Sequence, residues 1–141
     1  MDGCILFSDI LTPLPGMGVE FDIKEKAGPT LKPIRTPEQI SMMKIQDDWA
    51  KSMPFVKQTL GDLRKEVGLS ATVLGFVGLP YTLATYLIEG GTSSVYLEIK
   101  KMMYSEPKLL HTMLENLAEN IGNYACFQIE SGAQVIQIFD S

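Results

Sequence analysis

The sequence contains few of the residues that build metal, disulfide and nucleic-acid sites. Its 141 residues include two cysteines, one histidine and one tryptophan, and Arg35 and Arg64 are its two arginines. With no Cys-x-x-Cys pair and a single histidine, no zinc site built by the protein is expected. Cys4 and Cys126 both lie in apolar stretches, so we expect them to be reduced core residues of an intracellular protein.

Long hydrophobic runs and basic stripes are missing as well. No stretch of about 18 apolar residues occurs, so we expect no membrane-spanning helix. The first residues, Met1 to Cys4, lack the basic start of a signal or transit peptide. The formal net charge is −5 at pH 7 and the lysines are scattered, so nucleic-acid binding is not expected. A hydrophobic content of 45% is enough to build the core of one domain.

Three short apolar runs end abruptly in polar or glycine-rich sequence. They cover residues 4–7, 72–77 and 135–139. Apolar runs without strict alternation are typical of strands buried on both faces of a parallel sheet. The proline-rich stretch 13–33 contains a partly alternating run at 19–23, which indicates a hairpin-like excursion.

Helical periodicity fills the intervals between these runs. One apolar stripe covers residues 55–67, and a longer one opens at Ser105-Glu106-Pro107 and closes at Gly132. Thr36 followed by proline is typical of a capped helix start. Residues 82–88 are nearly apolar all round, which predicts a buried helix. Strands that alternate with helices predict an α/β fold.

In parallel α/β folds, functional residues gather where strands end. That rule selects Asp9, Asp140 and the segment 78–86. Each aspartate is either a reactive carboxylate or the cap of the next turn. Tyr86 must direct its hydroxyl to a backbone carbonyl or into a cavity. Residues 75–82 contain neither G-x-G-x-x-G nor G-K-[ST], so no phosphate site is expected.

Two other polar features have simple explanations. His111 and Glu115 are one helical turn apart and could bind a metal, but a solvated helix face is the expected explanation. Trp49 is expected to pack in the core. No Ser-His-Asp or Cys-His set can be assembled from these residues.

Three sequence blocks point to one family. The segment GFVGLPYTLATYLIEGG at 75–91, with FSDILTP at 7–13 and QIFDS at 137–141, resembles the signature of uroporphyrinogen decarboxylases. The resemblance covers essentially the whole chain. The residues of the three blocks are most similar to those of plant and algal plastid forms. The resemblance implies a (β/α)₈ TIM barrel that acts as a homodimer. It also implies a cofactor-free, metal-free carboxy-lyase that converts uroporphyrinogen III to coproporphyrinogen III in haem and chlorophyll synthesis.

The resemblance also assigns site residues. Asp9 matches the aspartate that faces the central pyrrole N–H groups, Tyr86 matches the active-site tyrosine, and Ser141 matches the serine that contacts substrate. Loss of CO₂ from an acetate arm would leave a carbanion unless the pyrrole is first protonated. A fixed carboxylate beneath the macrocycle stabilises the resulting cation.

Some parts of the family pattern have no counterpart in this chain. A barrel of this type needs about 250 residues, so residues 1–141 are expected to be an incomplete domain with roughly half of the barrel. The family's N-terminal arginine segment and C-terminal histidine are missing. Arg35 and Arg64 lie in a connecting segment and on an outer helix, whereas a polycarboxylate substrate needs cationic partners.

Two alternative functions and the compartment stay open. The chain could be a truncated, non-catalytic isoform that acts as an interaction protein. It could also belong to related barrels that transfer methyl groups to or from corrinoid carriers, usually with zinc. We expect no targeting segment within these residues. The resemblance implies the plastid stroma for a plant or algal source and the cytoplasm otherwise.

We predict that the 141-residue chain alone is inactive, because it is acidic and lacks the arginine segment that would hold a polycarboxylate. The purified chain should release no coproporphyrinogen from uroporphyrinogen III in a decarboxylation assay. Turnover above that of buffer would refute this prediction.

Overall fold

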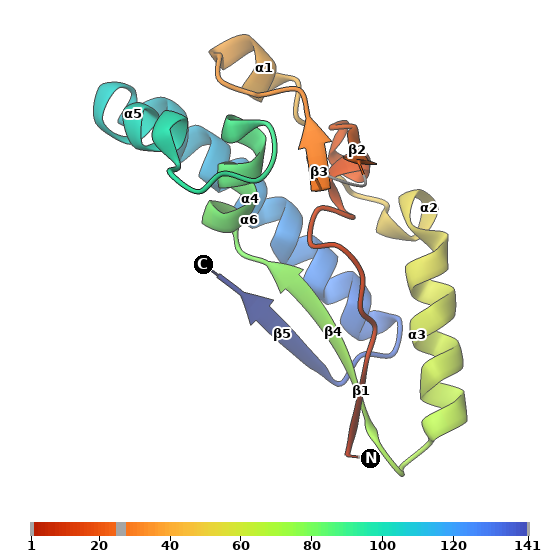
Figure 1. The fold of residues 1–141 in the computed structure, drawn as a ribbon. Coiled ribbons are helices and arrows are strands. Elements are labelled where there is room, and N and C mark those ends of the chain that lie inside the picture. Colours follow the sequence, from red (N-terminus) through yellow and green to blue (C-terminus); the bar gives the residue numbers. More distant parts are fainter. Residues whose placement is uncertain (1, 25–27, 141) are drawn as a thin grey trace.

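The computed structural model describes residues 2–24 and 28–140. It has a three-stranded parallel sheet and a separate antiparallel hairpin (Figure 1). The sheet contains β1 (Gly3–Ile5), β4 (Thr72–Gly78) and β5 (Val135–Phe139), and the hairpin contains β2 (Phe21–Lys24) and β3 (Gly28–Leu31).

One 3₁₀ helix and six α-helices fill the connections. They are η1 (Leu14–Met17), α1 (Pro37–Ser41), α2 (Trp49–Ser52), α3 (Pro54–Val67), α4 (Pro80–Glu89), α5 (Leu97–Ser105) and α6 (Pro107–Glu130). None of these described helices combines the length and the apolar character that a membrane crossing requires.

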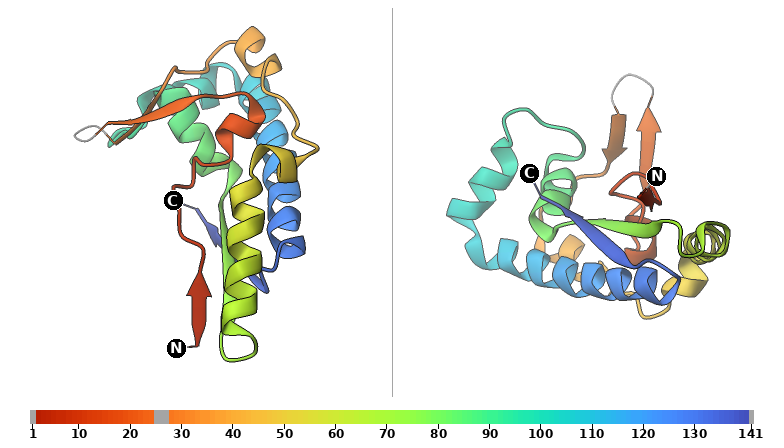
Figure 2. Two further views of the ribbon diagram at one scale, coloured as in Figure 1. Left: turned by 90° about the vertical axis from the view of Figure 1, so that its right-hand side faces the viewer. Right: turned by 90° about the horizontal axis from the view of Figure 1, so that it is seen from below.

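The order of strands in the sheet follows their order in the chain, β1-β4-β5. Each connection therefore moves one position in the same direction, as in a closed barrel and unlike a doubly wound sheet. Both α3 and α6 pack against β4, and Figure 2 shows the helices gathered on one side of the sheet. The fold is a partial (β/α) barrel, as the sequence predicts.

Local sequence explains the helix boundaries. Thr36 caps α1 by accepting a hydrogen bond from the backbone N–H of Gln39, whose side chain returns to the Thr36 N–H. The α6 stripe is buried against the sheet as expected, and Leu110, Met113 and Leu117 are at most 5% exposed. The hairpin and the buried α4 are also confirmed.

Two expectations are wrong in detail. Cys126 is exposed and Cys4 only partly buried, although both are free thiols. Cys126 is exposed because it lies outside the buried stripe of α6, although its neighbours in sequence are apolar. The first strand ends at Ile5 instead of continuing to Phe7.

The early end of β1 has a structural counterpart in the neighbouring strand. The Leu6 N–H donates to the Leu74 carbonyl at 2.9 Å. At Phe76 the hydrogen-bond partner changes: its N–H donates to Oε1 of Gln128 at 3.0 Å, and its carbonyl accepts from Nε2 of Gln128 at 2.9 Å. Gln128 comes from α6 and is 1% exposed.

Gly75 makes room for this side chain. A Cβ added at Gly75 would lie 2.3 Å from Oε1 of Gln128 and 2.9 Å from Cδ1 of Ile136. The Gln128 amide cannot withdraw without breaking its two hydrogen bonds to Phe76 in the core. The absence of a side chain at Gly75 is therefore a packing requirement.

The face of the sheet opposite the helices carries apolar side chains. Ile5, Phe7, Val135 and Phe139 are between 40% and 78% exposed. The parallel register places Val135 and Phe139 on the same face as Leu74 and Gly78, their partners on β4. This open face corresponds to the interior of a barrel.

We predict that Gly75→Ala lowers the free energy of unfolding by about 1–3 kcal/mol, because the added methyl overpacks the site. The matched control is Gly122→Ala on α6, where an added Cβ meets nothing within 4 Å. That change should raise stability by about 0.5–1 kcal/mol through helix propensity. Urea unfolding followed by circular dichroism measures both, and equal effects of the two substitutions would contradict the packing argument.

Candidate active site

The predicted site residues come from loops at one edge of the sheet. Asp9 follows β1, Tyr86 lies on α4 directly after β4, and Asp140 immediately follows β5. Because the three strands are parallel neighbours, the segments that follow them lead to the same edge of the sheet (Figure 1). Ser141, the third residue implied by the resemblance, lies outside the described residues.

Asp9 is held in a tight turn. Its Oδ1 accepts the backbone N–H of Leu11 at 2.8 Å, and its carbonyl accepts the Thr12 hydroxyl at 2.5 Å. Leu11 and Leu14 are fully buried and anchor the turn in the core. Among the described residues no donor reaches Oδ2, so half of a fixed carboxylate is available to a ligand.

Tyr86 lies close enough to Asp9 to sense its charge. Partial burial raises the pKa of the Tyr86 phenol, and the negative charge of Asp9 raises that pKa further, with a smaller contribution from Tyr96. The phenol therefore stays neutral and able to donate a hydrogen bond at physiological pH. The electrostatic contact brings together two residues that are 77 positions apart in sequence.

Tyr96 was not singled out from the sequence. It precedes α5 and adopts φ 52°, a left-handed backbone conformation that is uncommon outside glycine. Its N–H donates to Oγ of Ser93 at 3.0 Å, which holds the turn. No simple sequence signal marks a tyrosine at such a position.

Asp140 is tied to the start of α4. Thr82, 3% exposed, donates its hydroxyl to Oδ1 of Asp140 at 2.8 Å. This bond fixes the end of β5 relative to the helix that carries Tyr86. On the outer side, Asp140 borders an apolar groove of about 380 Å³ that also includes His111 and Glu115. His111 lies on the exposed side of α6, as expected.

Three phenylalanines form a row across the carboxyl end of the open face. The Phe76 ring stacks on Phe7 with centroids 5.8 Å apart and meets Phe139 edge-on at 6.0 Å. Each belongs to, or directly follows, a different strand. Sequence reasoning missed this row, because which phenylalanines meet depends on the register between the strands.

The two arginines are engaged elsewhere, as the sequence suggests. Arg35 donates from Nε to the Ile88 carbonyl at 2.7 Å, and its guanidinium lies 3.8 Å from Glu98. Arg64 donates to the Gly68 carbonyl at the end of α3. Within residues 2–24 and 28–140, no three His, Cys, Asp or Glu side chains form a group that could hold a metal ion.

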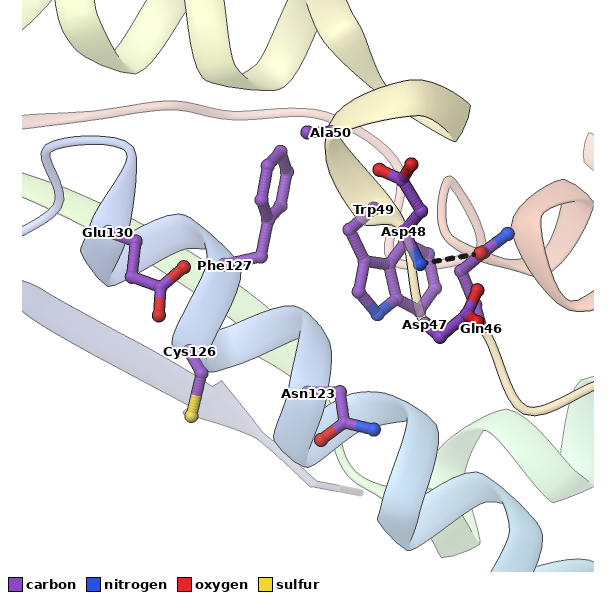
Figure 3. Close-up of a pocket in the computed structure, with 9 residues that line it drawn as sticks. All are labelled: Gln46, Asp47, Asp48, Trp49, Ala50, Asn123, Cys126, Phe127 and Glu130. Atoms are coloured by element: carbon purple, nitrogen blue, oxygen red, sulfur yellow. Dashed lines mark hydrogen bonds between the residues drawn. The ribbon is translucent and has the colours of Figure 1, made fainter.

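A second hollow, of about 290 Å³, lies between α2 and α6 (Figure 3). Trp49, Asn123 and Glu130 line it, and Trp49 is 4% exposed as expected for a core residue. The backbone N–H of Asp48 donates to Oε1 of Gln46 beside it at 2.9 Å. None of the residues predicted for the site contributes to this hollow.

These features define a segment of a (β/α)-barrel protein with a carboxylate and a phenol at the carboxyl edge of its strands. The family model of uroporphyrinogen decarboxylase matches residues 1–141. The chain belongs to the uroporphyrinogen decarboxylase family.

Curated relatives agree with the family model. Uroporphyrinogen decarboxylases of Synechococcus sp. (strain CC9902) and Picosynechococcus sp. (strain PCC 7002) are each 58% identical to the chain over 141 residues. The enzyme of Synechocystis sp. (strain PCC 6803) is 55% identical. The alignments cover 99% of this chain but 40% of each relative, so the chain spans about two fifths of their length. These relatives are cyanobacterial, whereas the residues of the three sequence blocks suggested plastid forms.

A solved structure supports the fold. A methyltransferase from Methanosarcina mazei superposes on 97% of this chain with a TM-score of 0.76, and the match covers 40% of that protein. The two sequences are 24% identical, so the likeness concerns the fold alone.

We predict that Asp9→Asn lowers the pKa of Tyr86 while leaving it above that of a free phenol. The substitution removes the negative charge that disfavours phenolate, but desolvation persists. Asparagine keeps the Oδ1 that accepts the Leu11 N–H, so the turn should survive. Titration of ¹³Cζ-labelled tyrosine, assigned with Tyr86→Phe, measures the shift. An unchanged Tyr86 pKa would show that the two side chains are not neighbours.

Proposed function

We propose that this chain forms the central part of an enzyme that decarboxylates uroporphyrinogen III to coproporphyrinogen III. The observation that carries the proposal is the family match over residues 1–141, together with Asp9 and Tyr86 at the expected edge of the sheet. Since the chain spans about 40% of its relatives, the activity is assigned to the complete polypeptide.

The reaction needs an electron sink. A proton adds to the pyrrole carbon beside an acetate arm and leaves a positive charge on the ring. The bond between the arm's CH₂ and its carboxylate then breaks, CO₂ leaves, and the electron pair neutralises the ring as an exocyclic C=C forms. Protonation of that methylene gives a methyl group, and loss of the first proton restores the pyrrole. The net change replaces one carboxylate by one hydrogen.

Asp9 suits the central role in this scheme. Its free Oδ2 would accept hydrogen bonds from the pyrrole N–H groups, and its charge would stabilise the ring cation. The turn fixes the carboxylate before substrate arrives, so little reorganisation is needed. The protein thereby supplies electrostatically what other decarboxylases obtain from a cofactor.

The residues around Asp9 would orient the substrate. Tyr86, a neutral phenol, would donate to Asp9 or to the reacting arm, and Ser141 would hold a carboxylate through a neutral hydrogen bond. The aromatic row of Phe7, Phe76 and Phe139 offers an apolar surface of the kind that a flat macrocycle covers.

The remaining family properties are parts of the same proposal. The cations that bind the substrate's carboxylates would come from the rest of the polypeptide, because Arg35 and Arg64 are engaged away from the site. We also propose a homodimer. The compartment would be the plastid stroma in a plant or alga and the cytoplasm in other organisms.

A chimera tests the function. Residues 1–141 replace the matching segment of the full-length Picosynechococcus enzyme, with which they are 58% identical. We predict that this chimera converts uroporphyrinogen III to coproporphyrinogen III, and that Asp9→Ala lowers kcat/KM by about 100-fold or more.

The matched control is Asp62→Asn, an exposed carboxylate on α3 that lies 3.6 Å from Lys65. It should leave turnover unchanged. A folded chimera without activity, or normal turnover with alanine at position 9, would overturn the proposal.

A further inference from the structure

The separation of β1 from β4 determines where Asp9 lies. Ile5 pairs with Leu74, so the same register continued would pair Phe7 with Phe76. The Phe76 N–H would then donate to the Leu6 carbonyl, and its carbonyl would accept the Ser8 N–H. Neither bond forms, because both Phe76 groups are bonded to Gln128.

The Gln128 amide thus occupies the place of a peptide group in the missing part of β1. It presents one acceptor and one donor to the same residue, as a neighbouring strand would. It reaches this place through the gap above Gly75 and is 1% exposed, so water does not compete for Phe76. Figure 1 shows the chain after β1 moving away from β4 as both run toward the carboxyl edge.

The residues after β1, which do not pair with β4, form the turn that carries Asp9. Phe7 keeps its ring on Phe76 at 5.8 Å, while the backbone after it turns. The position that a Gly78 Cβ would occupy lies 3.3 Å from Cβ of Ile10, so the turn rests on the end of β4. Asp9 lies between these two contacts and enters the turn that its Oδ1 stabilises.

We propose that Gln128 is a positioning residue for Asp9: its amide replaces strand β1 as the hydrogen-bond partner of Phe76 and so keeps residues 6–8 from pairing with β4, which leaves the Asp9 turn over the end of that strand. Gln128 touches neither Asp9 nor any reacting atom, so it acts through the path of the backbone. The assignment of Asp9 to catalysis rests on the function proposed above, whereas the geometric part of the inference stands without it.

Loss of the amide leaves two outcomes for Phe76. Its N–H and carbonyl stay buried without partners, which is costly for both groups. Alternatively, residues 6–8 pair with β4 and satisfy them. Pairing would straighten the segment and carry Asp9 away from Tyr86. The second outcome changes the site itself, and a purely structural role for Gln128 does not predict it.

The test compares two buried amides of α6 in the chimera. Gln128→Leu removes the bridge to Phe76. Asn120→Leu removes a fully buried amide that accepts the Gln46 N–H at 2.9 Å and donates to the Lys44 carbonyl at 3.0 Å, so that its bonds go to a loop and not to the sheet. Both changes delete backbone-directed hydrogen bonds from the same helix.

The diagnostic measurement is the effect of Asp9→Asn on the Tyr86 pKa in each background. We expect this effect to be lost with Gln128→Leu and retained with Asn120→Leu. In the active chimera, kcat should fall by about 100-fold with Gln128→Leu at nearly constant KM. An Asp9 effect that survives Gln128→Leu, or that both substitutions remove equally, would overturn the proposal.

Two further measurements keep the result decisive. If Gln128→Leu does not fold, hydrogen exchange in the unsubstituted chimera replaces it: the Phe76 N–H and the Gln128 side-chain amide must both be strongly protected, and fast exchange of either refutes the bridge. The Tyr86 titration requires a folded chimera but no turnover. An inactive chimera would therefore reject the proposed function and leave the geometric inference to its own result.

Discussion

The double pairing of β4 is the constraint on which the rest of the structure depends. This strand is bonded to β1 along one edge and to β5 along the other, both in parallel. Parallel pairing brings three carboxyl ends together and sends each connection across the same face. Asp9, Tyr86 and Asp140 lie at the same edge of the sheet because of this pairing, although no two of them are within 50 residues in sequence. Without β4 the three loops would have no common edge.

The carboxyl edge of the sheet holds two carboxylates in fixed positions. Most carboxylates of this acidic chain are solvated, but Asp9 and Asp140 are fixed by hydrogen bonds at strand ends. The neutral Tyr86 phenol accompanies Asp9, and the two arginines bind backbone carbonyls of α3 and α4. In the function proposed above, this segment would supply the anionic half of the site. A substrate with many carboxylates also needs a cationic half.

Hydrophobic periodicity and the positions of the strand ends predicted most of the fold, because both depend on residues that are close together in sequence. The apolar runs located β4 and β5 closely, and the Thr36 cap and the α6 stripe follow from spacing alone. The end of β1 could not be predicted, because the Phe76 groups that would continue the pairing are bonded to a glutamine that lies 52 residues further along the chain. The exposure of Cys126 depends on which side of α6 it occupies. For the candidate site, the strand-end rule selected Asp9, Asp140 and the segment that contains Tyr86, and the resemblance assigned the role of Tyr86. The strand-end rule missed the aromatic row because cross-strand contacts depend on register.

The open face of the sheet has a consequence for biosynthesis. Phe7 is 78% exposed and Val135 47% exposed, on a surface that a closed barrel would hide. A nascent chain that has completed these three strands exposes these apolar side chains to solvent until other segments cover them. Chaperone binding during this interval, and prompt arrival of the next strands, would then determine the yield of functional protein as much as final stability does.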